Sequence, residues 1–93
     1  MMITAKLFAT LRLKVGVGNV AVETDEPVTV RSLLRRVSDE IGHDIAPYLI
    51  EDDESIIPGT MILVGGKNIH HLDGLDTLVD GGDVAIFPPA GGG

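Results

Sequence analysis

The sequence predicts an α+β domain in which one main helix covers one face of a mixed sheet. Residues 3–24 alternate apolar and polar side chains, a period of two that is typical of half-buried strands. Residues 29–42 change to the period of an amphipathic helix, and residues 61–64 and 84–87 are short apolar runs between glycine and proline turns. A length of 93 residues accommodates one such domain and leaves no room for a second core of useful size.

The N-terminal part is predicted to be a β-hairpin. Apolar residues occupy every odd position of residues 3–15, and Phe8 is the apolar exception among the even positions. Residues 16–19 have turn chemistry, and residues 20–24 resume the period of two. The alternation places Phe8 on the sheet face away from the helix, and Phe87 is expected to join it there. An exposed aromatic pair indicates an interface; the alternative is that Phe8 is a lone exposed apolar residue.

The main helix is predicted from apolar residues spaced at i, i+3, i+4 and i+7. Thr29 can cap its N-terminus and Gly42 can end it. Charged residues fall largely on the other side of this helix, which is the ordinary solvated face of an amphipathic helix. The residues with the apolar spacing are Val30, Leu33, Leu34, Val37 and Ile41.

The middle of the chain is predicted to hold loops and a second hairpin. Pro47 opposes a long helix over the apolar residues 45–49, and the acidic run 51–54 reads as a surface loop. Residues 61–64 are expected to form a central strand that enters a tight turn, with residues 67–71 as the returning strand.

The chain is predicted to close with a last strand at residues 84–87, preceded by a helical turn around Leu75 and Leu78. The resulting order is β, β, α, β, short β, β, which a β-grasp, or ubiquitin-like, roll satisfies. In that roll the first and last strands are central neighbours. Residues 1–87 then form the domain, and residues 88–93 form a flexible tail that projects into solvent.

The composition excludes several classes of function. The net charge is −7, from 14 acidic and 7 basic side chains, and three residues are aromatic. Nucleic acid and anionic membranes are therefore not expected as partners, because both attract basic surfaces. Cysteine is absent, and there is neither a basic, apolar leader nor an apolar run long enough to span a membrane. A cytoplasmic location is expected.

No side-chain constellation for catalysis stands out. His70 and His71 are adjacent and would point to opposite faces of a strand, so no metal site is expected there. The acidic run 51–54 lacks the ligand spacing of an EF-hand loop. The protein is therefore not expected to be an enzyme by itself.

The terminal segment has an unusual composition. Pro88 and Pro89 restrict the backbone, and Ala90 and three glycines present no side chain larger than a methyl group. Fully extended, residues 88–93 reach roughly 20 Å and fit a narrow channel in another protein. The terminal carboxylate is then the group expected to carry chemistry; the alternative is an ordinary frayed end.

Residues 78–89 and the terminal glycines resemble the small-subunit family of molybdopterin synthase, the MoaD-like and ThiS-like sulfur carriers. Residues 7–12, 29–34 and 63–66 are similar to that family's first strand, helix start and central hairpin. The resemblance thus spans the domain, and the C-terminal motif is its most specific part.

The resemblance implies a sulfur carrier for molybdenum cofactor biosynthesis. An E1-like enzyme would use ATP to adenylate the terminal glycine, Gly93, or Gly92 if Gly93 is trimmed. Sulfur would replace AMP, and the thiocarboxylate would act in the large subunit of molybdopterin synthase. No tightly bound cofactor is implied. The residues implied to contact partners are Phe8, Phe87, Pro88, Pro89, Ala90, Gly91 and Gly92.

The sequence departs from the family in ending with three glycines rather than two. One extra residue moves the carboxylate by about 3.5 Å, enough to disturb an in-line attack. The alternatives are a sulfur carrier of another pathway, a ubiquitin-like protein modifier and a passive interaction module. Self-association of the free protein through the face that carries Phe8 is a further hypothesis.

Overall fold

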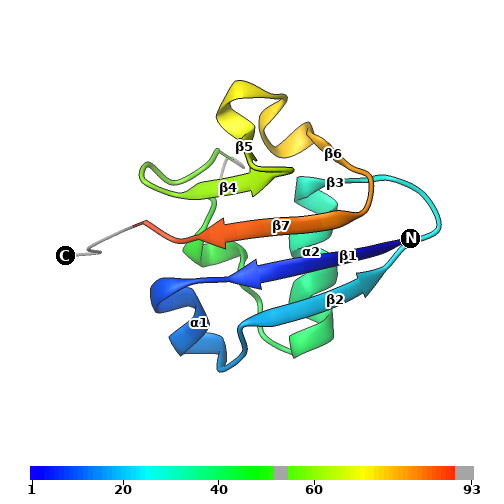
Figure 1. The fold of residues 1–93 in the computed structure, drawn as a ribbon. Helices are drawn as coiled ribbons and strands as arrows, with labels where there is room; N and C mark the ends of the chain where they lie inside the picture. The colour runs from blue at the N-terminus through cyan, green and yellow to red at the C-terminus, as the bar shows by residue number, and fades with distance from the viewer. Residues whose placement is uncertain (52–54, 90–93) are drawn as a thin grey trace.

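The computed structural model describes residues 1–51 and 55–89 (Figure 1). The first half of the chain forms β1 (Met2–Leu7), α1 (Ala9–Val15), β2 (Asn19–Glu23), β3 (Val28–Thr29) and α2 (Val30–Ile41). The second half forms η1 (Ala46–Tyr48), β4 (Met61–Val64), β5 (Lys67–Asn68), η2 (Ile69–His71), η3 (Gly74–Asp76), β6 (Leu78–Val79) and β7 (Gly82–Phe87). None of the helices in this described part is long and apolar enough to cross a bilayer.

The main sheet has five strands in the order β2-β1-β7-β4-β5. The first and last strands of the chain are parallel neighbours, with Ile3 opposite Gly82 and Leu7 opposite Ile86. The pairs β1 with β2, β7 with β4 and β4 with β5 are antiparallel. The mixed sheet and its central parallel pair confirm the predicted β-grasp roll.

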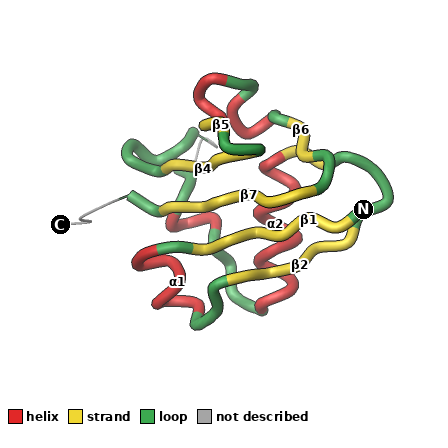
Figure 2. The backbone as a smooth tube through the Cα atoms, in the orientation of Figure 1, coloured by secondary structure: helices red, strands yellow, loops and turns green. Residues whose placement is uncertain are grey.

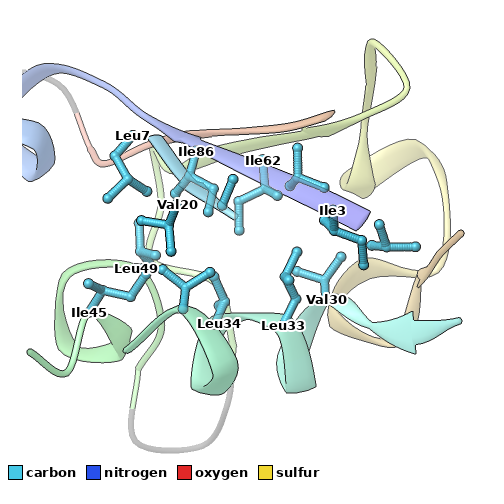
Figure 3. Packing of buried hydrophobic residues seen from close by; sticks show 14 of the residues in the cluster. Ile3, Leu7, Val20, Val30, Leu33, Leu34, Ile45, Leu49, Ile62 and Ile86 are labelled. Carbon is cyan, nitrogen blue, oxygen red and sulfur yellow. The ribbon is translucent and has the colours of Figure 1, made fainter. Parts of the chain in front are cut away.

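The core lies between one face of this sheet and α2, which crosses behind the strands (Figures 1 and 2). Alternate strand residues point inward, and Figure 3 shows Ile3, Leu7 and Ile86 of the sheet above Leu33 and Leu34 of the helix. All five are at most 2% exposed. The remaining strand residues point to the other face of the sheet, which no helix of residues 1–51 and 55–89 covers (Figure 1).

The main helix begins and ends at the predicted residues. The Thr29 hydroxyl accepts a hydrogen bond from the Ser32 amide at 3.1 Å, which satisfies an N–H group that the first helical turn leaves unpaired. Gly42 follows Ile41 in the left-handed conformation, at φ 69°, and donates its amide to the Ser38 carbonyl. The predicted cap and terminator are both confirmed.

The prediction of the first hairpin is wrong in one respect. Strands β1 and β2 do pair antiparallel, but Ala9–Val15 forms the helix α1 instead of continuing the first strand. Leu11 is buried and Leu13 is 81% exposed, so the two do not share a face as strand residues would. The segment consists largely of good helix formers. In addition, β7 ends at Phe87 and is followed by two prolines without amide donors, so a longer β1 would find no ladder partner there.

The returning strand of the second hairpin is shorter than predicted. Only Lys67–Asn68 pairs with β4, and residues 69–71 form the 3-10 turn η2. The Asn68 side chain accepts a hydrogen bond from the His70 amide at 3.0 Å and turns the chain there. His70 and His71 therefore do not lie on a strand, and both are exposed.

The helical turn predicted around Leu75 and Leu78 includes only the first of these residues. Leu75 is buried in η3, whereas Leu78 belongs to β6 and pairs with Thr29. The last strand starts at Gly82, two residues before its predicted beginning. Within the acidic run, Glu51 is exposed, and residues 52–54 lie outside the described part.

Candidate functional site

Two aromatic rings lie side by side where the central strands end. Leu7 of β1 is opposite Ile86 of β7, so the next residues, Phe8 and Phe87, are neighbours. The Phe8 amide donates a hydrogen bond to the Ile86 carbonyl at 3.1 Å, which continues the parallel ladder by one residue. The rings stack with centroids 4.4 Å apart and planes inclined by 7°. Both rings are half-buried. The prediction that they share a face is confirmed.

The uncovered face continues from this pair onto β4. Met61 is opposite Phe87, and Leu63 is opposite Ala85. Directly opposite residues of an antiparallel pair project to the same side of the sheet. We call Phe8, Met61, Leu63, Ala85 and Phe87 the outer-face patch. None of the five is fully buried, so their apolar atoms remain available to a partner surface.

An ion pair borders the outer-face patch. Lys6 Nζ lies 3.1 Å from Asp83 Oδ2, and both side chains are more than 40% exposed. At such exposure the pair contributes little to stability. Because both side chains are charged, the apolar surface of the outer-face patch ends at this ion pair, on the part of β1 and β7 that lies away from the rings.

The base of the predicted tail packs on the domain. Pro88 is buried and Pro89 is half-buried. A Cβ built on Gly59 would lie 3.5 Å from Pro89 Cβ, so the turn that contains Gly59 is in contact range of Pro89. Gly59 has φ +92°, which L side chains rarely adopt. The turn before β4 therefore supports the chain at the point where it leaves the sheet. Ala90, Gly91, Gly92 and Gly93 lie outside the described residues.

A strained residue follows Phe8. Ala9 has φ +54°, the left-handed region that costs an alanine free energy because its Cβ approaches the backbone. Phe8 itself is extended, at φ −124° and ψ 164°.

The change of backbone direction at Ala9 therefore keeps the Phe8 ring beside Phe87 while α1 leads away from the sheet.

Polar side chains of the described residues make contacts within the domain. Across residues 1–51 and 55–89, no cluster of three or more histidine, aspartate or glutamate side chains is placed to hold a metal ion. His43 is engaged with the Tyr48 hydroxyl at 3.2 Å. Ser38 donates to the Leu34 carbonyl and accepts from the Ile45 amide, which ties α2 to the following loop. These contacts are structural.

Sequence reasoning missed Gly59, Met61 and Leu63. Met61 and Leu63 belong to a continuous apolar run in which no alternation separates the two faces. Their outward direction follows from their pairing with Phe87 and Ala85. The role of Gly59 depends on contact with Pro89, and nothing in the local sequence indicates that contact beyond a Pro-Gly turn signal.

Known proteins are similar to this chain in sequence and in fold. The sequence model of the ThiS family matches residues 5–93. The chain belongs to the ThiS family. Among its relatives, small archaeal modifier protein 3 of Haloferax volcanii is 39% identical over 89 residues, which cover 95% of each chain. A protein of Archaeoglobus fulgidus, whose name proposes a sulfur-carrier role, is 35% identical over 89% of this chain and 96% of its own.

The fold of this ThiS-family chain is also that of solved structures. The crystal structure of SAMP1 from Haloferax volcanii superposes with a TM-score of 0.80 and 26% identity, and all of both chains is covered. The coarse function follows: the chain is a small ubiquitin-like protein of the sulfur-carrier and modifier type.

Proposed function

We propose that this protein carries sulfur on its terminal glycine. The observation that supports the proposal best is the anchored start of the terminal segment: Phe87 is stacked on Phe8, Pro88 is buried and Pro89 is in contact range of Gly59. A segment held at its base and lacking bulky side chains reaches into the active site of another protein without blocking it. This arrangement supplies a substrate, and the catalytic groups belong to partner enzymes.

The chemistry proceeds in two steps. The carboxylate of Gly93, or of Gly92 if Gly93 is trimmed, attacks the α-phosphorus of ATP in an E1-like enzyme and releases pyrophosphate. Hydrosulfide then attacks the carbonyl carbon of the acyl adenylate, AMP leaves, and a thiocarboxylate remains. Activation is needed because a free carboxylate is a poor acyl donor, whereas AMP is a good leaving group.

The resemblance to molybdopterin synthase small subunits favours one destination for the sulfur. In this proposal the terminal segment enters the large subunit of molybdopterin synthase in the cytoplasm, and the sulfur contributes to the dithiolene of molybdopterin. The outer-face patch docks on the large subunit, because its apolar surface lies next to the base of the segment.

A specific observation favours a second function, that of a protein modifier. The relative that is 39% identical is named a small archaeal modifier protein. The same acyl adenylate, attacked by a lysine amine of a target protein instead of a sulfur nucleophile, gives an isopeptide. The third glycine suits this use, because an isopeptide need not be placed in a reaction chamber built for two glycines.

Intact mass spectrometry of the protein purified from its native host tests the proposal. The sulfur carrier predicts a mass increase equal to the exchange of one oxygen for sulfur, and loss of that increase when the activating enzyme is deleted. Isopeptide-linked conjugates in place of thiocarboxylate would support the modifier. An unchanged mass after incubation with the activating enzyme, ATP and a sulfur donor would contradict both. The same spectrum shows whether Gly93 is retained.

A further inference from the structure

Strand β2 lies at one edge of the sheet. It is the first strand in the sheet order, and β1 is its one neighbour among the strands of the described residues. Gly18 and Thr24 flank β2. The Gly18 carbonyl accepts a hydrogen bond from the Leu7 amide, and the Thr24 amide donates one to the Met1 carbonyl, each at 2.9 Å. Backbone groups of successive strand residues point to alternate sides. With Gly18 and Thr24 directed toward β1, the N–H and C=O groups of Asn19, Ala21 and Glu23 are directed away from the sheet.

An arginine closes one end of this edge. Arg36 Nη2, on α2, donates a hydrogen bond to the Glu23 carbonyl at 2.7 Å, which confirms that this carbonyl faces outward. Among the described residues, no side chain is hydrogen-bonded to the outward peptide groups of Asn19 and Ala21, and both residues are exposed. An exposed edge of this kind is a template for an additional strand.

A second guanidinium lies near the other end. A Cβ built on Gly18 would be 3.0 Å from Arg12 Nε and 3.1 Å from Arg12 Cζ, so the Arg12 side chain lies over the start of β2. From Gly18 to Glu23 the strand spans roughly 17 Å. Within the described residues, no carboxylate forms an ion pair with Arg12 or Arg36. The protein as a whole is acidic, so two unneutralised cations at the ends of one open edge are a specific local charge pattern.

The opposite edge of the sheet differs. Strand β5 consists of Lys67 and Asn68 alone, and the chain then turns into η2. Two residues offer too short a ladder for a docked strand. The two edges are therefore not equivalent, and β2 is the one suited to strand addition (Figure 1).

We propose that β2 binds an extended acidic segment of a partner protein as an added strand. The backbone of the segment pairs with Asn19 and Ala21, and its carboxylates contact Arg12 and Arg36 at the two ends. Charge complementarity selects an acidic segment over a basic one. This surface lies on the edge of the sheet, apart from the outer-face patch. The inference goes beyond the proposed function and does not depend on thiocarboxylate formation.

The experiment uses the full chain and a fluorescein-labelled synthetic peptide in which valine alternates with glutamate. Fluorescence anisotropy measures binding, and amide chemical shifts locate it. Ala21→Pro removes the outward N–H and spares the ladder to β1, since proline is tolerated where the N–H faces solvent. Arg36→Glu reverses one charge, and Lys67→Glu makes the same change at the opposite edge as the matched control. We expect both β2-edge variants to bind about tenfold more weakly or worse, and the control to bind within about twofold of the original chain.

Several results would overturn the proposal. These are unchanged binding by Ala21→Pro, equal binding of a peptide in which valine alternates with lysine, and shift changes confined to Phe8 and Phe87. Equal competition by an oligothymidine would also count against it, because a general anion site needs no strand pairing. Circular dichroism checks the fold of each variant. If Ala21→Pro does not fold, Asn19→Pro removes the neighbouring outward N–H in its place.

Discussion

Phe8 and Phe87 stack with their centroids 4.4 Å apart, one ring directly after the first strand and the other at the end of the last. The parallel register of β1 and β7 brings them together, since Leu7 is opposite Ile86. The pair thus joins the uncovered face of the sheet to the base of the terminal segment, and a change in either ring affects both.

Replacing both rings in a double-mutant cycle measures this contact. Phe8→Ala and Phe87→Ala each lower the free energy of unfolding, and the double variant should lose less than the sum by about 1 kcal/mol, because one stacked pair is lost once. Urea denaturation provides the four values. Strictly additive losses would show that the rings do not stabilise each other in solution.

Gly59→Ala should harm the terminal segment more than it harms the fold. The left-handed backbone at Gly59 strains an alanine by about 1 to 2 kcal/mol. The added Cβ would itself be in ordinary van der Waals contact with Pro89, so the effect on Pro89 comes from the backbone shift that relieves this strain. The matched control is Gly65→Ala, which has φ +58° and no atom within 4 Å of the added Cβ. Both variants should lose similar stability in thermal unfolding, while Gly59→Ala alone should slow thiocarboxylate formation. Equal rates of thiocarboxylate formation in the two variants would show that Gly59 does not help to position the terminal segment.

Ala9→Gly should stabilise the protein. Relief of the left-handed strain at φ +54° exceeds the added freedom of the unfolded chain, for a gain of about 0.5 kcal/mol. Ala21→Gly is the control, because Ala21 is an exposed strand residue without positive φ and should lose about 0.5 to 1 kcal/mol. Urea midpoints that move in the same direction for both variants would contradict the strain at Ala9.

Thr29→Ala should destabilise α2 through loss of its N-cap. The Ser32 amide loses its hydroxyl acceptor, at a cost of about 1 kcal/mol. Thr29→Ser keeps the hydroxyl acceptor, and its free energy of unfolding should stay within about 0.3 kcal/mol of that of the original chain. Thermal melts of the three proteins make the comparison. A serine variant as unstable as the alanine variant would assign the loss to the threonine methyl group and not to the cap.

The features that the sequence predicted correctly depend on local signals. The limits of α2 follow from the apolar spacing together with Thr29 and Gly42, all within one stretch of chain. The turn residues before β4 and after β7 similarly delimit those strands. Local patterns also sufficed for the shared face of Phe8 and Phe87, since parity along a strand assigns each side chain to one face.

The segments that were wrong are those in which two local patterns coincide. Leu11 and Val15 are compatible with both a strand and a helix, because their spacing of four fits a multiple of two and one helical turn. What decides for α1 is that β7 stops at Phe87 and leaves no partner for a longer β1. The 3-10 conformation of residues 69–71 likewise depends on tertiary contacts: β5 pairs with β4 over two residues, and the Asn68 side chain caps the turn that follows.

By itself, the sequence determined the fold class, the main helix, the parity of Phe8 and Phe87 and the chemically distinctive glycine end. Only the tertiary structure decided that Met61 and Leu63 extend the outer-face patch, that Gly59 supports Pro89, and that Arg12 and Arg36 lie at the two ends of a free edge. The physical reason is range. Periodicity and capping act between residues a few positions apart, whereas strand register, packing of distant turns and the placement of charges depend on contacts that exist only once the chain has folded.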